Sequence, residues 1–363
     1  MALTNRKSSR VWFTAAETRT GNENSPDQYA SATGRFEGRG VMTFPTPSRQ
    51  IESDKNKLGS GEHGKAAQLM TIATPWSYKT NRPEEIGYLL AYFMGSPDVF
   101  SGHRHTLYHL GVDDLELPSF GFQYFDGVAN KTFAGAVVNE FNFSFPFQGG
   151  NGQIEATFSG WCNAHYVAAG VITQLANGSL AAGPVNTFLE PIVNVKSCSV
   201  WLADALEPNF SSPSIEQQEE DLGANLIDIT ALINSATITG NNGMSMEDKI
   251  RAGGWGIIND FTRGVRAFTC ELNVRKDESI INWDTLATAR TQKSIELEWN
   301  GPVIATTESY LMDLFFPVVE VNNVVEDDNT PIGQAVTTEI FQDSSARAMI
   351  ASIQSSSQTA FFS

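Results

Sequence analysis

The stretch LGSGEHGKAA, residues 58–67, has the glycine and lysine spacing of a phosphate-binding loop. In such a loop the backbone N–H groups hold the phosphates, and a Ser or Thr after the Lys holds Mg²⁺. Here Ala66 follows Lys65, and Glu62 would repel a phosphate. The flanking residues predict neither the buried strand nor the helix that the site requires. We interpret the stretch as a Gly-rich loop and expect no nucleotide cofactor.

A second cluster of reactive side chains is GHRHTLYHL, which holds His103, His105 and His109. In a strand these three would lie on one face, so a metal site is geometrically conceivable. No Cys lies nearby, and Asp113 and Asp114 are the only close carboxylates. A polar strand that tolerates histidines explains the pattern equally well. We expect no metal here.

No motif in the chain predicts hydrolysis. The nucleophile motif G-x-S-x-G and the zinc motif H-E-x-x-H are both absent from the sequence. The chain has 41 acidic residues, so neighbouring carboxylates such as those at 219–221 are expected by chance in solvated loops. We predict that the protein is not an enzyme and has no catalytic residues.

The composition of the chain excludes further classes of protein. The 363 residues carry a net charge of −17, which argues against a surface that grips nucleic acid or an anionic membrane. It does not exclude a nucleic acid that passes without binding. Three cysteines without a C-x-x-C pair predict neither a disulfide framework nor a zinc site. The N-terminus shows no secretory signal and no apolar run reaches membrane length, so we expect a soluble protein made in a reducing cytoplasm.

One helix is well signalled, over residues 83–94. Pro83 suits the first helical position, and two glutamates follow it at the positive end of the dipole. Gly95 then ends the pattern. Its apolar residues recur with helical spacing, which predicts an amphipathic helix packed on a sheet; they are Ile86, Leu89, Leu90, Phe93 and Met94.

Elsewhere the apolar residues alternate with polar ones, as in half-buried strands. The stretches at 140–147 and 154–159 flank a Gly/Asn turn, which predicts a hairpin. The stretches at 268–275 and 295–300 form a second such pair, joined by a longer connection at about 276–292. The polar positions of both pairs contain glutamates. The fold class is therefore mainly β, with one flanking helix.

Several stretches, taken in order, resemble the tail tube (major tail) proteins of long-tailed phages. The segment 117–161 resembles their first core hairpin, with Phe133-Ala134-Gly135 and Val138-Asn139-Glu140-Phe141 at the family's pattern positions. SRVWFTAAETRTGN resembles the opening strand, RPEEIGYLLAYFMGS the helix, and GHRHTLYHL the aromatic/His strand. VRAFTCELNVR resembles the second core hairpin, FFPVVEVNN the late strand with Pro317, and MIASIQSSSQTAF the closing strand.

The resemblance implies a structural virion protein that polymerises into stacked rings, usually hexameric, whose strands close one shared barrel around a DNA channel. Its partners would be further copies of itself and other tail proteins, in the virion tail after assembly in the host cytoplasm. DNA would pass through the lumen without tight binding, because six copies carry six times −17, or −102. The residues expected to line the lumen are Glu140, Asn142, Ser144, Glu155, Thr157, Glu271, Asn273, Glu296 and Glu298.

We expect one tail-tube-like domain over residues 1–363. It would comprise an N-terminal arm and loop (1–65) held by a neighbouring subunit, the helix and first core hairpin (66–162), a variable middle with a possible outer insertion (163–260), and the second core hairpin with the closing strands (261–363). Three other tail components stay open as alternatives: a baseplate hub, a tail terminator or a decoration protein. A carbohydrate-binding β-sandwich also stays open.

Overall fold

The strands of this chain cover most of the residues that the computed structural model describes, which confirms the mainly β class. The described residues are 10–16, 18–19, 29–30, 34–43, 74–95, 99–101, 104–110, 117–125, 130–148, 152–162, 191–205, 226–244, 264–305, 308–327, 333–342 and 347–355. The Gly-rich stretch 58–67 and His103 lie outside them. The side chains of the other two candidate histidines are not described either.

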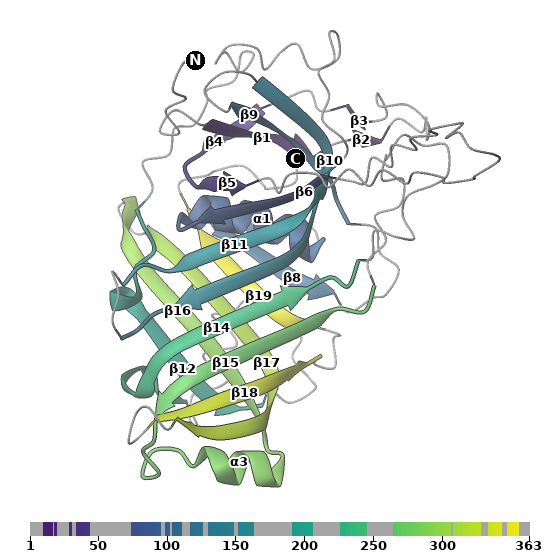
Figure 1. The fold of residues 1–363 in the computed structure, drawn as a ribbon. Coiled ribbons are helices and arrows are strands. Elements are labelled where there is room, and N and C mark those ends of the chain that lie inside the picture. Colours follow the sequence, from purple (N-terminus) through teal and green to yellow (C-terminus); the bar gives the residue numbers. More distant parts are fainter. Residues whose placement is uncertain are drawn as a thin grey trace, which may run out of the picture.

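The elements follow the chain in the order shown in Figure 1. They are β1 (Arg10–Ala16), β2 (Thr18–Arg19), β3 (Tyr29–Ala30), β4 (Gly34–Gly38), β5 (Val41–Thr43), β6 (Thr74–Thr80), α1 (Pro83–Met94), β7 (Val99–Ser101), β8 (Arg104–Leu110), β9 (Phe120–Phe125), β10 (Asn130–Phe145), β11 (Glu155–Cys162), β12 (Cys198–Asp204), β13 (Ile227–Asp228), β14 (Ile233–Asn241), β15 (Ala267–Arg275), α3 (Trp283–Ala289), β16 (Gln292–Ala305), β17 (Glu308–Asp327), β18 (Gly333–Phe341) and β19 (Arg347–Gln354).

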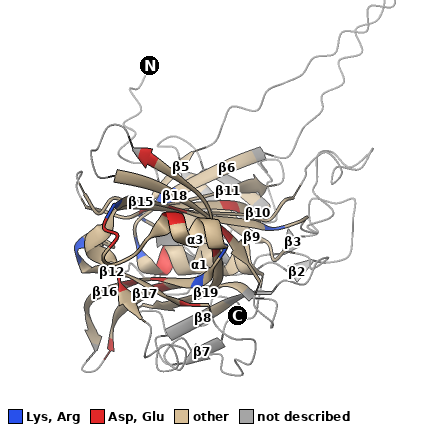
Figure 2. Cartoon of the chain, turned by 90° about the horizontal axis from the view of Figure 1, so that it is seen from below, with Lys and Arg blue, Asp and Glu red and all other residues tan. Residues whose placement is uncertain are grey.

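The strands form two layers, which Figure 2 shows one above the other. The first layer, here called the main sheet, has the order β5-β6-β11-β10-β14-β15-β18 and ends on the second half of β17. The second layer has the order β8-β19-β17-β16-β12 and uses the first half of β17. The first half of β10 also joins a small sheet with β9, β1 and β4.

Strand β17 connects the layers because its two halves pair differently. Leu311–Phe315 pairs with β19, whereas Val318–Asp327 pairs with β18 on the same edge. The register shifts near Pro317, a residue that strands tolerate at such irregularities. The pairings among the described strands form a branched series without a closed circuit, so this chain by itself makes an open sheet and not a closed barrel.

Helix α1 has the predicted bounds, but it is buried on every side. All twelve of its residues are buried, including Glu84 and Glu85. It contacts β10 of the main sheet as well as β8 and β19 of the second layer, and Figure 2 shows it between the two. The prediction of a helix that packs on a sheet with one face only is therefore wrong, because every face of α1 is buried. Gly95 ends it in the left-handed conformation, with φ of 69°.

The core between the layers is rich in phenylalanine. Phe141 and Phe143 lie on the buried face of β10, where the predicted alternation places them. The Phe93 ring of α1 meets the Phe141 ring edge-on at 4.8 Å between centroids. Such contacts add to the free energy of apolar burial and fix how the helix sits against the sheet. One continuous cluster includes buried side chains of α1 and of both layers.

The first predicted hairpin is confirmed, because β10 and β11 pair with Asn142 opposite Thr157. The second is wrong: β15 pairs with β14 and β18, and β16 pairs with β12 and β17. The long connection between β15 and β16 contains α3, a helix that the alternation pattern did not reveal. At the end of the sandwich this connection leads the chain from the main sheet into the second layer (Figure 1).

The described parts of the N-terminal range 1–65 and of the middle range 163–260 belong to the chain's own sheets. Parts of the N-terminal range form β1, β4 and β5 on the chain's own sheets, with Phe13 fully buried against Tyr78 and Tyr88, so a neighbouring subunit is not needed to hold these parts. The middle range 163–260 supplies β12 and β14, and β14 lies inside the main sheet. The possible outer insertion in this range stays a prediction. The division of the chain into segments stays a prediction.

Gly160 tests how tightly β10 and β11 pair. A Cβ atom at this position would lie 1.9 Å from the backbone oxygen of Val137. The backbone cannot yield as a side chain would, so we expect Gly160→Ala to lower the free energy of unfolding by about 1–3 kcal/mol or more. Ser159→Ala, at the partly exposed neighbouring position, should change it by less than about 0.5 kcal/mol. If both variants unfolded at the same midpoint concentration of urea, the close pairing of β10 and β11 at Gly160 would be contradicted.

Candidate functional site

The exposed side of the main sheet is a continuous polar surface, here called the polar face. On β6, β11, β10, β14, β15 and β18 the residues that point away from the core are mostly Ser, Thr, Asn and Glu. The alternation that buries the phenylalanines places these residues on the opposite side, because side chains alternate across a strand. The candidate site is therefore a wide sheet face rather than a pocket.

One row of cross-strand neighbours runs across the whole polar face. Its members, in spatial order from β5 to β18, are Val41, Lys79, Thr157, Asn142, Thr239, Thr269 and Glu339. Side chains along the face bond to one another. The hydroxyl oxygens of Thr239 and Thr269 are 2.5 Å apart. Glu140 accepts hydrogen bonds from Asn241, at 2.8 Å, and from Ser159, at 3.3 Å. The face is thus ordered by its own polar contacts.

Seven of the nine lumen candidates lie on this face, and the structure brings them together on neighbouring strands. They are Glu140, Asn142 and Ser144 of β10, Glu155 and Thr157 of β11, and Glu271 and Asn273 of β15. Glu296 and Glu298 do not join them. They lie on β16 in the second layer, paired with β12, and Glu296 is only 3% exposed.

The polar face carries little net charge. Its described charged side chains are five carboxylates and two cations, namely Glu140, Glu155, Glu271, Glu320, Glu339, Lys79 and Arg275. Lys79 pairs with Glu155, with Nζ 2.5 Å from Oε2. Both are about half exposed, so the pair contributes little stability. Most of the chain's −17 therefore lies elsewhere, and the polar face is rich in hydroxyl and amide groups with a slight excess of acid.

Strand β14 is the part of this face that sequence reasoning missed. Its segment reads INSATITGN, with the partly exposed Ser235, Thr237, Thr239 and Asn241 alternating with buried residues. Unlike the two predicted pairs of strands, this stretch contains no charged side chain to mark a solvent face. The period of two was nevertheless present and would have identified it.

A buried carboxylate holds the edge of the main sheet in place. Oε1 of Glu85 on α1 accepts a hydrogen bond from the Arg39 backbone N–H at 2.6 Å. Its Oε2 accepts bonds from the Tyr78 hydroxyl at 2.6 Å and the Thr80 hydroxyl at 2.5 Å. The Tyr78 oxygen in turn accepts a bond from the Gly40 N–H at 2.7 Å. The turn before β5 is therefore tied to β6 and to the start of α1.

This network shifts the acidities of its members. Burial raises the pKa of Glu85 above its ordinary value of 4.5, and the hydrogen bonds from Thr80, Tyr78 and Arg39 oppose that rise. Burial also raises the pKa of Tyr78 well above its ordinary range, as does the neighbouring carboxylate. Tyr78 therefore stays protonated and donates its hydrogen to Glu85 at neutral pH.

The other end of α1 is tied to the same sheet. The Arg266 guanidinium donates to the carbonyl oxygens of Phe93 at 3.2 Å and Met94 at 2.9 Å. The Asn242 side chain donates to the Phe93 carbonyl at 3.1 Å and to that of Val138 at 3.0 Å. The bonds to Phe93 and Met94 satisfy carbonyls that a helix end leaves without partners, and the bond to Val138 ties Asn242 to β10. Helix α1 thus positions both the edge and the middle of the polar face.

Chemically reactive groups do not gather at this face. The described residues include no group of three or more His, Cys, Asp or Glu that could hold a metal ion. Burial raises the pKa of the Cys198 and Cys270 thiols to about 12, so both stay protonated. Among the described residues, no helix is long and apolar enough to cross a membrane.

Comparison with known families gives a match of large extent. The sequence pattern of the phage tail tube protein family matches residues 70–340, which includes α1, nearly all of the main sheet and most of the second layer. The chain belongs to the phage tail tube protein family. Tail tube proteins are structural components of the phage tail, which favours a structural over an enzymatic role. A search of the curated proteins finds no match.

Glu85 provides a test of the buried network. Its folded-state pKa is raised, so the folded protein binds more protons than the unfolded chain as pH rises above 4.5. The wild-type free energy of unfolding should therefore fall with rising pH relative to that of Glu85→Gln, which cannot titrate. Urea unfolding from acid to neutral pH measures this difference. A stability difference that stays constant across the range would contradict it.

Proposed function

We propose that copies of this chain assemble into rings that stack into the phage tail tube, with the polar face lining the channel for DNA. The observation that carries the proposal is the polar face itself: a wide, exposed, hydrophilic side of a sheet whose other side is packed with phenylalanine. A sheet open at its edges suits closure by repetition around a ring, which removes edges that would otherwise aggregate.

Four adjacent strands suffice for such a lining. β11, β10, β14 and β15 are neighbours and carry all seven candidates that share the face. In this chain β6 pairs with the outer edge of β11, and β18 pairs with the outer edge of β15. The four strands would therefore form the lumen-facing part of each copy, and neighbouring copies would meet beyond β6 and β18. The proposed lining therefore consists of these four strands, without Glu296 and Glu298.

The chemistry of the face suits passage of DNA rather than binding. Tight binding of DNA requires many Lys and Arg side chains that release counterions from the phosphates. The face has only Lys79 and Arg275, and Lys79 is already paired with Glu155. Hydroxyl and amide groups keep it wetted, and the slight excess of carboxylates repels phosphate. DNA therefore moves along it without being held.

The proposed function also implies which partners the chain contacts and where it resides. The chain would contact copies of itself within and between rings, and other tail proteins at the two ends of the tube. It would be made and assembled in the host cytoplasm and reside in the virion tail. We propose no catalytic activity and no cofactor, since movement through a channel requires neither. A baseplate, terminator, decoration or carbohydrate-binding role has no observation in its favour beyond the β fold.

Polymerisation is the direct test of this function. Purified protein, imaged by electron microscopy at increasing concentration and after seeding with phage tail ends, should form hollow tubes of uniform width. Single rings or monomers under all of these conditions would contradict the proposal and favour a terminator or decoration role. A binding assay against a glycan array distinguishes the carbohydrate-binding alternative, and we expect no binding.

Added positive charge on the polar face should slow DNA release. Asn142→Arg with Glu271→Arg places two cations on exposed positions, so tubes should still form. We expect phages that carry this double variant to eject DNA more slowly at low salt and to recover at high salt. Val303→Arg, on an exposed position of β16 outside the face, serves as the control. Equal ejection rates for the two would show that the polar face does not meet DNA.

A further inference from the structure

The turn between β4 and β5, together with β5 itself, forms a fixed projection at one end of the main sheet, here called the corner (Gly38–Thr43). Glu85 and Tyr78 bind its backbone through the N–H groups of Arg39 and Gly40. A Cβ atom at Gly40 would lie 2.3 Å from the Lys79 carbonyl oxygen, so only glycine permits this close approach. The network thus holds the corner from inside.

Within the corner, the side chains of Arg39 and Val41 point away from that anchor, whereas Met42 is buried. Arg39 is exposed, and Val41 is 65% exposed although it is a large apolar residue on a strand. Only one edge of β5 pairs with another described strand, β6. A fixed projection that presents a cation and an apolar side chain beside an open strand edge is suited to contact another surface.

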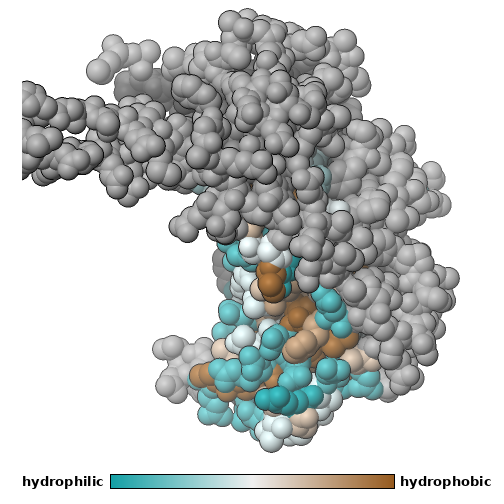
Figure 3. Space-filling view, turned by 90° about the vertical axis from the view of Figure 1, so that its right-hand side faces the viewer, coloured by the Kyte–Doolittle hydropathy of each residue, from teal (hydrophilic) through white to brown (hydrophobic). Residues whose placement is uncertain are grey.

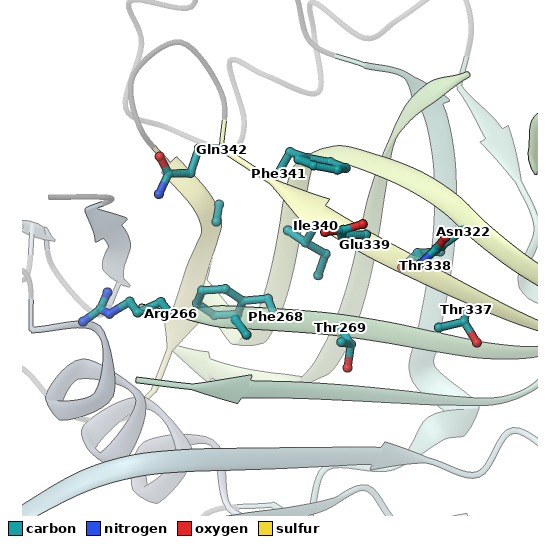
Figure 4. A pocket seen from close by; sticks show the side chains of 12 residues that line it. Arg266, Phe268, Thr269, Asn322, Thr337, Thr338, Glu339, Ile340, Phe341 and Gln342 are labelled. Atoms are coloured by element: carbon teal, nitrogen blue, oxygen red, sulfur yellow. The ribbon is translucent and has the colours of Figure 1, made fainter. Parts of the chain in front are cut away.

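The opposite end of the main sheet has a hollow of about 640 Å³. Residues of β15, β17, β18 and β19 line it. Figure 4 shows Phe268 and Thr269 of β15 and Glu339, Ile340 and Phe341 of the neighbouring β18 among the side chains that line this space. Phe341 is 37% exposed, and Glu339 is exposed as well. Figure 3 shows apolar side chains gathered among hydrophilic ones on the right-hand side of the molecule.

The corner and the hollow lie at the two ends of one row. The cross-strand row that begins at Val41 reaches Glu339 and then Glu320 on β17. Beyond Glu320, the edge of β17 opposite β18 has no partner strand among the described residues. Every pairing in this series is antiparallel, so β5 and β17 run in opposite directions. A copy placed beside the sheet by rotation about an axis roughly along the strands would therefore continue the antiparallel alternation.

We propose that the corner of one copy docks in the hollow of the next copy, so that Arg39 meets Glu339 and Val41 meets Phe341. The charges are complementary and both apolar side chains are exposed in the single chain. The contact joins two different surfaces, so its repetition produces a ring or a helix rather than a closed pair. This inference rests on the proposed ring and names the surfaces by which neighbouring subunits meet.

Chemical crosslinking in assembled protein tests the contact. Val41→Cys with Phe341→Cys, treated with a short bis-maleimide, should give a denaturation-resistant ladder that extends beyond dimers. Val303→Cys with Phe341→Cys is the matched control, because Val303 is equally exposed but lies on β16. The three native cysteines are buried, so the unsubstituted chain should give no ladder. Tubes of the first variant without a ladder, or with dimers only, would overturn the docking.

A charge exchange tests it without a crosslinker. Arg39→Glu should raise the concentration needed for assembly several-fold, and adding Glu339→Arg should restore it toward the wild-type value. The contact would be contradicted if adding Glu339→Arg raised the concentration needed for assembly still further, while the free energy of unfolding of both variants equalled that of the wild type. If the unsubstituted protein forms no rings or tubes at all, both the proposed function and this contact are refuted. Tubes that form independently of these charges refute the contact alone.

Discussion

The structure depends on a sheet that is apolar on one side and polar on the other. Alternation in β10 sends Phe141 and Phe143 inward and Asn142 outward, so one sequence pattern creates both the core and the proposed functional surface. A shift of one residue in strand pairing would exchange the two sides and bury the polar groups. The packing of Phe93 of α1 against Phe141 fixes which side is inside.

Helix α1 has a larger role than covering a sheet. It lies between the layers, and its two ends bind different parts of the main sheet through Glu85 and Arg266. Burying a carboxylate is costly unless it is hydrogen-bonded, and Glu85 accepts three bonds. The same bonds hold the projection at the sheet edge. In this account the core thus prepares the surface by which neighbouring subunits would meet.

The sequence predicted those features that depend on local patterns. The helix over 83–94 and the pairing of β10 with β11 follow from spacing and turn residues within a short window. The partners of β15 and β16 could not be predicted in this way, because pairing over long separations depends on how the chain crosses between layers. The clear alternation around Glu296 was read as a solvent face, although that side chain is buried. Alternation shows that two faces differ, but not what covers each of them.

The measurement that tests this account most directly is an electron cryomicroscopy map of the assembled protein that resolves side chains. The account predicts a channel lined by β11, β10, β14 and β15, with Asn142, Thr239 and Glu271 facing the lumen and the second layer on the outside. A channel lined by β12, β16 and β19, or an assembly in which the polar face is buried between subunits, would contradict it.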